Sequence, residues 1–272
     1  MRGVKREVMD LGISLVNPQW INARVTETRL IDVRRTQDYE AGHIPGAKSL
    51  PVTEFVKIVG RLKDAPEPDE FSNLMRHLGV CSNSPVVVYD DQRGVYASRL
   101  LWTLELYGHS NLHLLDRNFS TYAQDGGDTT QDEPEVPSGS FTARSGKRLM
   151  ATMKDIQDVL HRGSGLVLDA GERMDFLNGH ILGALNLSWQ ILVDRKRSFL
   201  PKERLKQIFK EHGLEKNTQI IVYCKDGMTS SHLYVALRLA GHDNVKLYSR
   251  GYAEWEETKQ PVKAEFQELL NP

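Results

Sequence analysis

The sequence predicts two tandem α/β domains, each built on a small parallel β-sheet flanked by helices. The chain has 272 residues, more than one hydrophobic core usually stabilises. Its two halves carry the same motifs in the same order. The apolar runs in both halves lack the alternation of polar and apolar residues found in sheets with one solvated face. Parallel strands covered on both faces have this character, so an α/β architecture is expected in each half.

An internal repeat relates the two halves. The motif Gly-His-Ile-Pro-Gly-Ala in the first half returns as Gly-His-Ile-Leu-Gly-Ala in the second, and each follows an aspartate, Asp32 or Asp169, at the same spacing. Further along, the apolar run VVVY is followed by Asp90, and its counterpart IIVY is followed by Cys224. The separation between matching motifs drifts slightly along the chain, as expected where loops of a duplicated domain have gained or lost residues.

Local signals predict the elements of each half in order. Asn17, followed by proline, is a suitable N-cap, and Thr152 with Asp155 resembles a capping box, so a helix is expected to open each half. Short apolar runs without alternation then predict buried strands. The expected strands lie at residues 30–33, 86–89, 166–170 and 220–223, and the expected helices end at Gly79, Gly213 and, for the helix over 231–240, at Gly241.

A linker is expected between the halves. The segment QDGGDTTQDEPEVPSGS, residues 124–140, contains one aliphatic side chain, Val136, among Gly, Pro, Asp and Ser. This composition predicts a first domain over residues 1–123, a linker over 124–145 and a second domain over 146–272. The first domain is expected to be non-catalytic, to pack against the second, and to form one wall of a cleft above the active site.

Composition narrows the class of function. Apolar residues make up 40% of the chain and the net charge is −1, so no nucleic-acid or anionic-membrane partner is expected. No run of about 18 apolar residues occurs, and the N-terminal stretch MRGVKREVMDLGISLV lacks a signal-peptide core. A cytoplasmic location is therefore expected.

Cys224 is the candidate for chemistry. Binding sites of open α/β sheets form at the carboxyl ends of strands, and Cys224 directly follows the strand at 220–223. Loop amides, a helix N-terminus and the Lys225 ammonium favour the thiolate, while the Asp226 carboxylate opposes it, so on balance a lowered pKa is expected. The loop expected to bind substrate consists of Lys225, Asp226, Gly227, Met228, Thr229 and Ser230.

The other cysteine, Cys81, is expected to be incidental, because the matching position in the second half is not a cysteine. Two cysteines are too few for a disulfide framework and lack metal-ligand spacing, so neither a metal nor a cofactor is expected. Isolated cysteines are commonly inert core residues. Cys224, however, lies at a strand end in register with the repeat, and this position favours a chemical role over an inert core position.

These motifs resemble the rhodanese family over nearly the whole chain. The resemblance rests on the repeated aspartate, the Gly-His-Ile motifs, the strand ending in Cys224, and the segment Tyr-Ser-Arg-Gly-Tyr-Ala-Glu-Trp that begins at Tyr248. In tandem members the second domain holds the catalytic cysteine and the first commonly holds an aspartate, as at Asp90. The resemblance implies a sulfurtransferase in which a sulfane sulfur passes from a donor to Cys224 as a persulfide, and then to cyanide or a thiol, with a protein acceptor as an alternative.

The loop Cys-Lys-Asp-Gly-Met-Thr matches neither the thiosulfate nor the 3-mercaptopyruvate branch of the family. Lys225 supplies a cation suited to a dianion, which favours thiosulfate over 3-mercaptopyruvate. Arginines that often follow the second-domain aspartate are missing here, because positions 171 and 175 are Gly171 and Asp175, and Arg173 is the remaining cation. If neither cation reaches the donor, low classical activity and a protein persulfide donor are expected.

Other polar residues are expected to be structural. The histidines of the two Gly-His-Ile motifs, His43 and His180, are expected to order their loops by hydrogen bonds. The repeated aspartates are expected to accept backbone donors. Arg34 is expected to form a solvated ion pair rather than reach the cleft. Domain-core positions are expected for Trp102, Trp189 and Trp255, and a solvated loop for Asp194, Arg195, Lys196 and Arg197.

Two rival functions remain. A cysteine phosphatase would need His before the cysteine and Arg six positions after it, where this chain has Tyr223 and Ser230. A sulfur-carrier or binding module without turnover is the second rival, supported by the missing arginines. A thiosulfate:cyanide assay distinguishes it from the enzyme.

Overall fold

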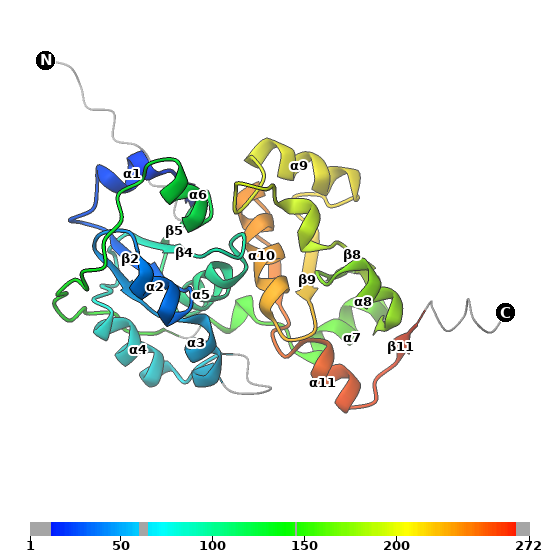
Figure 1. Cartoon of the computed structure of the whole chain (residues 1–272). Helices are drawn as coiled ribbons and strands as arrows, with labels where there is room; N and C mark the ends of the chain where they lie inside the picture. Colours follow the sequence, from blue (N-terminus) through cyan, green and yellow to red (C-terminus); the bar gives the residue numbers. More distant parts are fainter. Residues whose placement is uncertain (1–11, 60–64, 145, 265–272) are drawn as a thin grey trace, which may run out of the picture.

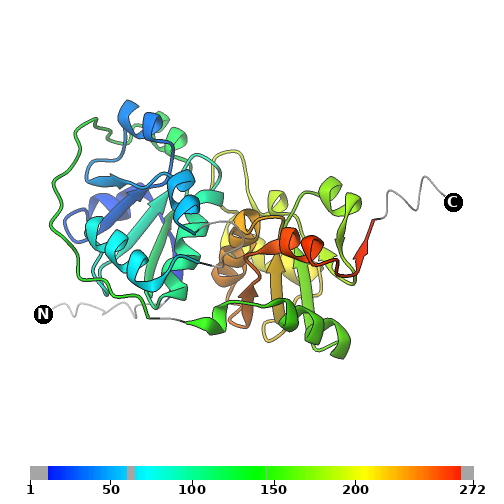
Figure 2. The same ribbon diagram turned by 90° about the horizontal axis from the view of Figure 1, so that it is seen from below.

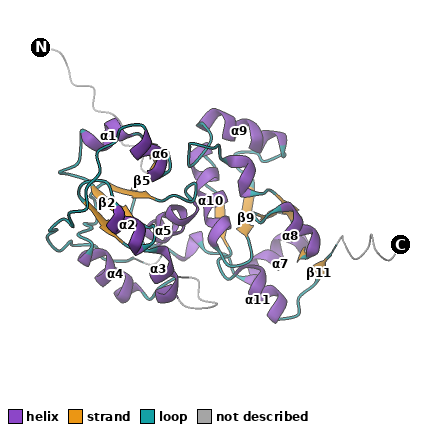
Figure 3. Ribbon diagram, viewed as in Figure 1, coloured by secondary structure: helices purple, strands orange, loops and turns teal. Residues whose placement is uncertain are grey.

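The computed structural model describes residues 12–59, 65–144 and 146–264. It consists of two α/β halves that lie side by side (Figure 1). Figure 3 shows the strands of both sheets in the interior with helices around them. The N-terminal stretch was expected to lack a signal-peptide core. Most of it, residues 1–11, lies outside the described residues. No helix in the described ranges combines the length and apolar character needed to cross a bilayer.

The first half contains a five-stranded, all-parallel sheet with strand order β1-β5-β4-β2-β3. Its strands are β1 (Gly12–Val16), β2 (Arg29–Asp32), β3 (Ala47–Ser49), β4 (Val86–Tyr89) and β5 (Asn111–Leu115). Its helices are α1 (Pro18–Asn22), α2 (Thr36–Ala41), α3 (Val52–Val59), α4 (Pro68–His77), α5 (Val95–Leu106) and α6 (Phe119–Gln124).

The second half contains a four-stranded parallel sheet with strand order β10-β9-β6-β8, and a separate antiparallel pair, β11 with β7. Its strands are β6 (Gly165–Asp169), β7 (His180–Ile181), β8 (Leu185–Asn186), β9 (Gln219–Tyr223), β10 (Val245–Leu247) and β11 (Val262–Lys263). Its helices are α7 (Met153–Arg162), α8 (Arg173–Asn178), α9 (Lys202–Glu211), α10 (Met228–Ala240) and α11 (Gly251–Glu257), with 3-10 turns η1 (Lys147–Leu149) and η2 (Trp189–Leu192).

The two sheets repeat the same topology, as the sequence repeat predicts. The order β5-β4-β2-β3 in the first half corresponds to β10-β9-β6-β8 in the second. The register agrees as well, because Asp32 pairs with Tyr89 and Asp169 pairs with Tyr223. The predicted α/β class with two tandem domains is therefore confirmed.

Local signals account for the element ends. The Thr152 side chain accepts from the Asp155 amide and the Asp155 carboxylate accepts from the Thr152 amide, which is the predicted capping box at α7. Gly241, with φ of 94°, ends α10 in the left-handed region. The prediction for the start of this helix is wrong by three residues: α10 begins at Met228 rather than residue 231.

The segment predicted as a linker lies along the outside of the first half (Figure 2). His43 and Thr130 exchange both backbone hydrogen bonds at 2.9 Å, and Lys48 forms an ion pair with Glu133. Phe141 is buried in the apolar core beside Phe71. The segment thus has the polar composition of a linker and is nevertheless held to the first half by backbone pairing.

Helices α5 and α10 pack against each other between the two sheets (Figure 1). Apolar side chains of both helices belong to one continuous cluster of buried residues that extends into both sheets. Polar contacts also join the two helices. The Glu105 carboxylate of α5 accepts hydrogen bonds from Tyr234 Oη and from the Arg238 guanidinium of α10, both at 2.9 Å. The interface between the halves is therefore an extension of both cores.

Candidate active site

Cys224 lies at the carboxyl end of β9, the central strand next to β6, and directly before the loop that leads into α10. Its side chain is 2% exposed. Gly227, with φ of 86°, is the N-cap of α10, so the turn between strand and helix contains only Lys225, Asp226 and Gly227. Met228, Thr229 and Ser230, predicted as loop residues, form the first turn of the helix.

Polar groups surround the Sγ atom of Cys224. The Gly227 amide donates to Sγ at 3.2 Å, and Ser230 Oγ lies 3.3 Å from it. The Asp226 carboxylate is also near, with Oδ1 3.8 Å from Sγ. The same Oδ1 accepts the Met228 amide at 3.2 Å, which holds the carboxylate beside the sulfur. Two donors for an anionic sulfur and one proton acceptor thus meet at this atom.

The pKa of Cys224 is raised, so the prediction of a lowered pKa is wrong. Burial of the thiol is the largest cause, and the negative charge of Asp226 adds to it. Hydrogen bonds from Ser230 and Thr229 lower the pKa but do not outweigh burial. Lys225, expected to favour the thiolate, is exposed. Burial and the Asp226 charge both favour the thiol over the thiolate.

The start of α11 is hydrogen-bonded to the backbone of the cysteine loop. The Tyr252 amide donates to the Cys224 carbonyl at 2.8 Å, and the Ala253 amide donates to the Lys225 carbonyl at 3.2 Å. A Cβ on Gly251, whose φ is 64°, would stand 2.2 Å from the Cys224 carbonyl oxygen. Only glycine fits this approach. Gly251 and Tyr252 were not among the predicted site residues, although the aromatic, glycine-containing motif around them was recognised.

A pocket of about 500 Å³ opens above Cys224. Its lining comes from the strand ends and helices of the second half: Asp169, Gly171, Glu172, Asp175, Asn178, Gly179, Trp189, Cys224, Lys225, Asp226, Thr229, Tyr252 and Glu256. No residue in this lining belongs to the first half, so the expectation that the first domain walls the cleft is not met. Trp189, predicted as core, is half-buried and lines the pocket.

The pocket lining is acidic. Five of its residues are carboxylic acids and one, Lys225, is a base. The pKa of Asp169 is raised by burial and by Asp175, and the pKa of Tyr252 is raised by burial, Glu256 and Asp169. Burial is the largest cause of both shifts, and the neighbouring carboxylates add to it.

Arg173, the predicted anion-binding arginine, is not part of this lining. Its side chain is exposed, and its guanidinium lies 5.6 Å from the ring centre of Phe176. Of the two predicted donor-binding cations, the structure therefore brings Lys225 and not Arg173 to the pocket of Cys224.

The first half contains a degenerate copy of the cysteine loop. The Asp90 carboxylate is buried and accepts three backbone amides, from Gln92, Gly94 and Ala97, at 2.8 to 2.9 Å. Its loop has one more residue before the helix than the loop of Cys224, and Arg93 takes a positive φ of 53° just before the N-cap. The Asp90 carboxylate thus accepts the backbone amides of its own loop.

A side chain of the first half also lies close to the cysteine loop. Arg99, in α5, is 3% exposed, and its NH1 atom lies 3.3 Å from where a Gly227 Cβ would stand. Its guanidinium is also 4.9 Å from the ring centre of Trp102. The first domain therefore supports the turn that donates to Sγ, although it contributes nothing to the pocket lining.

The structural roles expected for the histidines are confirmed. His43 Nδ1 bonds to the Tyr39 carbonyl at 2.9 Å, and His180 Nδ1 bonds to the Phe176 carbonyl at 2.7 Å, each ring stacking on the same residue. Arg34, by contrast, is not solvated: it is 6% exposed and pairs with Asp32.

The positions of the repeated aspartates and of two predicted core tryptophans agree with the structure. Asp32 and Asp169 accept the backbone amides two residues ahead, at 2.9 and 2.7 Å. Trp102 and Trp255 are buried in core clusters. The side chains of Arg195, Lys196 and Arg197 are exposed. Cys81 is a half-buried free thiol whose amide bonds to Ser84.

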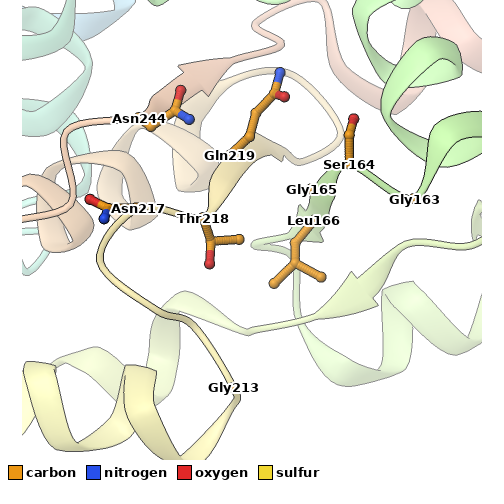
Figure 4. A pocket seen from close by; sticks show the side chains of 9 residues that line it. All are labelled: Gly163, Ser164, Gly165, Leu166, Gly213, Asn217, Thr218, Gln219 and Asn244. Carbon is orange, nitrogen blue, oxygen red and sulfur yellow. The ribbon is translucent and has the colours of Figure 1, made fainter.

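A further pocket, of about 460 Å³, lies at the opposite ends of the strands, where β6 and β9 begin (Figure 4). Its lining is uncharged and contains no thiol or imidazole: Gly163, Ser164, Gly165, Leu166, Gly213, Asn217, Thr218, Gln219 and Asn244. It offers no carboxyl group or ammonium group either. Within the described residues, no group of three or more His, Cys, Asp or Glu side chains is placed to hold a metal ion.

Comparison with known proteins agrees with this geometry. Residues 17–125 and 152–258 each match the family model described as Rhodanese-like domain. Sulfur carrier protein TtuD of Thermus thermophilus is 26% identical, over 89% of this chain and 93% of that protein. The 3-mercaptopyruvate sulfurtransferase of Escherichia coli is 29% identical, over 87% and 88%, and a thiosulfate sulfurtransferase of Corynebacterium glutamicum is 27% identical, over 89% and 87%.

Solved structures give the same result for the fold. The crystal structure of SseA from Escherichia coli, a 3-mercaptopyruvate sulfotransferase, superposes with a TM-score of 0.78 at 27% identity and covers 88% of this chain and 98% of its own. The structure of EanB superposes with a TM-score of 0.81 at 16% identity, over 92% of this chain and 68% of its own.

Proposed function

Because the chain belongs to the rhodanese family, we propose that Cys224 carries a sulfane sulfur as a persulfide between a small donor and a thiophilic acceptor. Sulfur transfer of the thiosulfate and 3-mercaptopyruvate type is the activity class of the chain and of its curated relatives. The observation that supports Cys224 as the carrier is the set of donors around its Sγ atom, the Gly227 amide at 3.2 Å and Ser230 Oγ at 3.3 Å. These groups can stabilise an anionic sulfur in a site with little water.

The proposed reaction has two displacements. In the first, the thiol proton leaves, with Asp226 Oδ1 at 3.8 Å as its acceptor. Sγ then attacks the transferable sulfur of the donor and a new S–S bond forms. The S–S bond of thiosulfate, or the C–S bond of 3-mercaptopyruvate, breaks with its electron pair on the leaving sulfite or on the enolate of pyruvate. In the second, the acceptor attacks the outer sulfur and the electron pair returns to Sγ. A difficult transfer is thereby divided into two nucleophilic steps.

The acidic lining of the pocket affects which sulfur donor can bind near Cys224. Thiosulfate, the donor favoured by the sequence, is a dianion, and Lys225 is the one base in the lining against five carboxylic acids. A donor of lower charge, such as 3-mercaptopyruvate or a protein persulfide, meets less repulsion in such a pocket. We therefore propose that 3-mercaptopyruvate loads Cys224 faster than thiosulfate does, which reverses the preference suggested by Lys225 alone.

The experiment is persulfide detection on intact protein. Wild-type protein treated with 3-mercaptopyruvate or thiosulfate should gain the mass of one sulfur atom and lose it to cyanide. Cys224→Ser should gain none, because a serine hydroxyl is too basic to accept sulfur at neutral pH. Cys81→Ser is the matched control and should behave as wild type. Persistent sulfur loading of the Cys224→Ser protein would show that the site is elsewhere.

A second candidate function is a sulfur carrier that delivers to a protein and does not turn over small acceptors. The name of the TtuD relative and the exposed position of Arg173 favour it. Loading of Cys224 without release to cyanide or small thiols would identify this function. A phosphatase is disfavoured, since Tyr223 and Ser230 occupy the positions where His and Arg would hold a phosphate.

We also propose the domain boundaries 1–123, 124–145 and 146–272, supported by elements that end at Gln124 and resume, after a 3-10 turn, at Met153. The cytoplasm is the proposed compartment, because a carrier thiol must stay reduced between cycles and both cysteines are free.

A further inference from the structure

The two halves differ in charge at two matching positions that follow the repeated aspartate. Arg34 and Arg35 follow the aspartate of the first half, and Gly171 and Glu172 follow the aspartate of the second. Both arginines line the pocket near Asp91 in the first half, while Glu172 lines the pocket of Cys224. At these positions the half that contains Cys224 thus has a neutral residue and a carboxylate where the first half has two cations, an arrangement that does not favour an anionic ligand.

The carboxylates of this pocket are not neutralised by the protein. Among the described residues, Glu172, Asp175, Asp226 and Glu256 form no ion pair with Lys or Arg. Glu172 accepts only the neutral amide of Gln190, at 2.9 Å. All four side chains are exposed and lie around a buried nucleophile, the thiol of Cys224. A bound cation would therefore gain attraction that no basic side chain already satisfies.

Two aromatic side chains complete this lining. Trp189, from η2, and Tyr252, from α11, border the same pocket and are half-buried. Aromatic faces attract ammonium groups, and they do so more strongly where water is partly excluded. Carboxylates and aromatic rings around one cavity are the combination suited to an organic cation rather than to a metal ion, which would need converging oxygen ligands.

We propose that the sulfur acceptor of Cys224 is a small thiol that carries a positive charge, with its ammonium group held among Glu172, Asp175 and Glu256. This inference rests on the proposed persulfide function and adds the chemical class of the acceptor. The anionic donor and the cationic acceptor meet the site in separate steps, so one pocket can serve both with different rates.

The transfer step balances without a further reactant. The acceptor thiol sulfur attacks the outer sulfur of the Cys224 persulfide anion and a new S–S bond forms. The bond between that sulfur and Sγ breaks, and its electron pair remains on Sγ. The proton of the acceptor thiol ends on Sγ, which regenerates the Cys224 thiol, and the product leaves as a persulfide anion. No net oxidation occurs.

The experiment compares three small thiols of similar size and different charge: cysteamine, 2-mercaptoethanol and thioglycolate. Cys224 is first loaded with 3-mercaptopyruvate, excess donor is removed, and the added sulfur is verified by mass. Loss of that sulfur is then timed with each thiol, in wild-type protein and in the variant Glu172→Gln/Asp175→Asn/Glu256→Gln. The ratio of wild-type to variant rates for each thiol cancels the different intrinsic reactivities of the thiols.

The variant should be about three- to tenfold slower with cysteamine, unchanged within about twofold with 2-mercaptoethanol, and faster with thioglycolate, because a charged cleft concentrates ligands of opposite sign. Added salt should narrow these differences. Glu203→Gln, an exposed carboxylate on α9, is the matched control and should change none of the three rates. The Glu172→Gln single variant should show the same pattern with smaller factors.

Equal effects on all three thiols, or the same pattern in Glu203→Gln, would overturn the inference and leave the persulfide function standing. Failure of Cys224 to load from any donor would instead overturn the proposed function, and the inference with it. The two failures are distinguished because loading is measured before any acceptor is added.

Discussion

The Asp226 carboxylate lies 3.8 Å from the Sγ atom of Cys224, and its negative charge raises the pKa of that thiol together with burial. Asp226→Asn should therefore lower the pKa, because it removes the charge while an amide oxygen can still accept the Met228 backbone. The measurement is the rate of alkylation by iodoacetamide as a function of pH.

For this alkylation, the wild-type rate should keep rising with pH beyond 9.0, the ordinary value for a cysteine, because only the thiolate reacts. In Asp226→Asn the rise should level off at lower pH. Asp158→Asn, an exposed position on α7, is the control. An unshifted profile in Asp226→Asn would mean that burial alone sets the pKa of Cys224.

Lys225 is the one base in the pocket lining. Lys225→Ala should raise the KM for thiosulfate and slow persulfide formation, by about fivefold, which corresponds to the loss of about 1 kcal/mol from an exposed cation. The effect should be smaller for 3-mercaptopyruvate, which carries less charge. Lys206→Ala on α9 is the control. Identical steady-state kinetics of Lys225→Ala and wild type with thiosulfate would remove Lys225 from the site.

Asp90 occupies the position in the first half that Cys224 has in the second. The double variant Asp90→Cys/Cys224→Ser should remain inactive, because the extra loop residue and the positive φ of Arg93 place the amides differently around a shorter side chain. Intact-protein mass after treatment with donor is the measurement. A gain of one sulfur atom in this variant would show that the first loop can also cradle a persulfide.

Glu105 joins the two halves through Tyr234 and Arg238. Glu105→Ala should lower the free energy of unfolding by about 1 to 3 kcal/mol, since it leaves two partly buried donors unpaired at the interface. Urea denaturation measures this. Asp243→Ala, which removes an exposed partner of the same Arg238, should cost less than about 1 kcal/mol. Equal losses in the two variants would contradict a special role for the interface contact.

The first half should also be needed for solubility of the second. A chain beginning at residue 146 would expose the face of α10 that packs on α5, including the Tyr234 side chain. Large exposed apolar patches promote association. Sedimentation of the purified fragment tests this, and it should be less soluble than the full chain. A monomeric fragment that loads Cys224 at the full rate would show that Arg99 and α5 contribute nothing to the loop.

The sequence by itself determined the duplicated α/β fold, the strand at whose end Cys224 lies, and the degenerate copy at Asp90. These features are encoded locally, in apolar runs, capping residues and a repeat whose register survives in both sheets. The structural roles of the histidines followed from the same local motifs. The α10 start was misplaced because an N-cap glycine gives a weaker local signal than Ser, Thr, Asp or Asn.

The tertiary structure alone decided the electrostatics of the site. Whether the thiol of Cys224 is charged depends on its burial and on the direction of the Asp226 carboxylate, and neither can be read from composition. The pocket gathers Glu172, Trp189 and Glu256 from separate segments, because the carboxyl ends of parallel strands bring distant parts of the chain to one edge of the sheet. Attraction and repulsion between charges act through space and not along the chain, so the acidic character of this pocket emerged only when these segments were folded together.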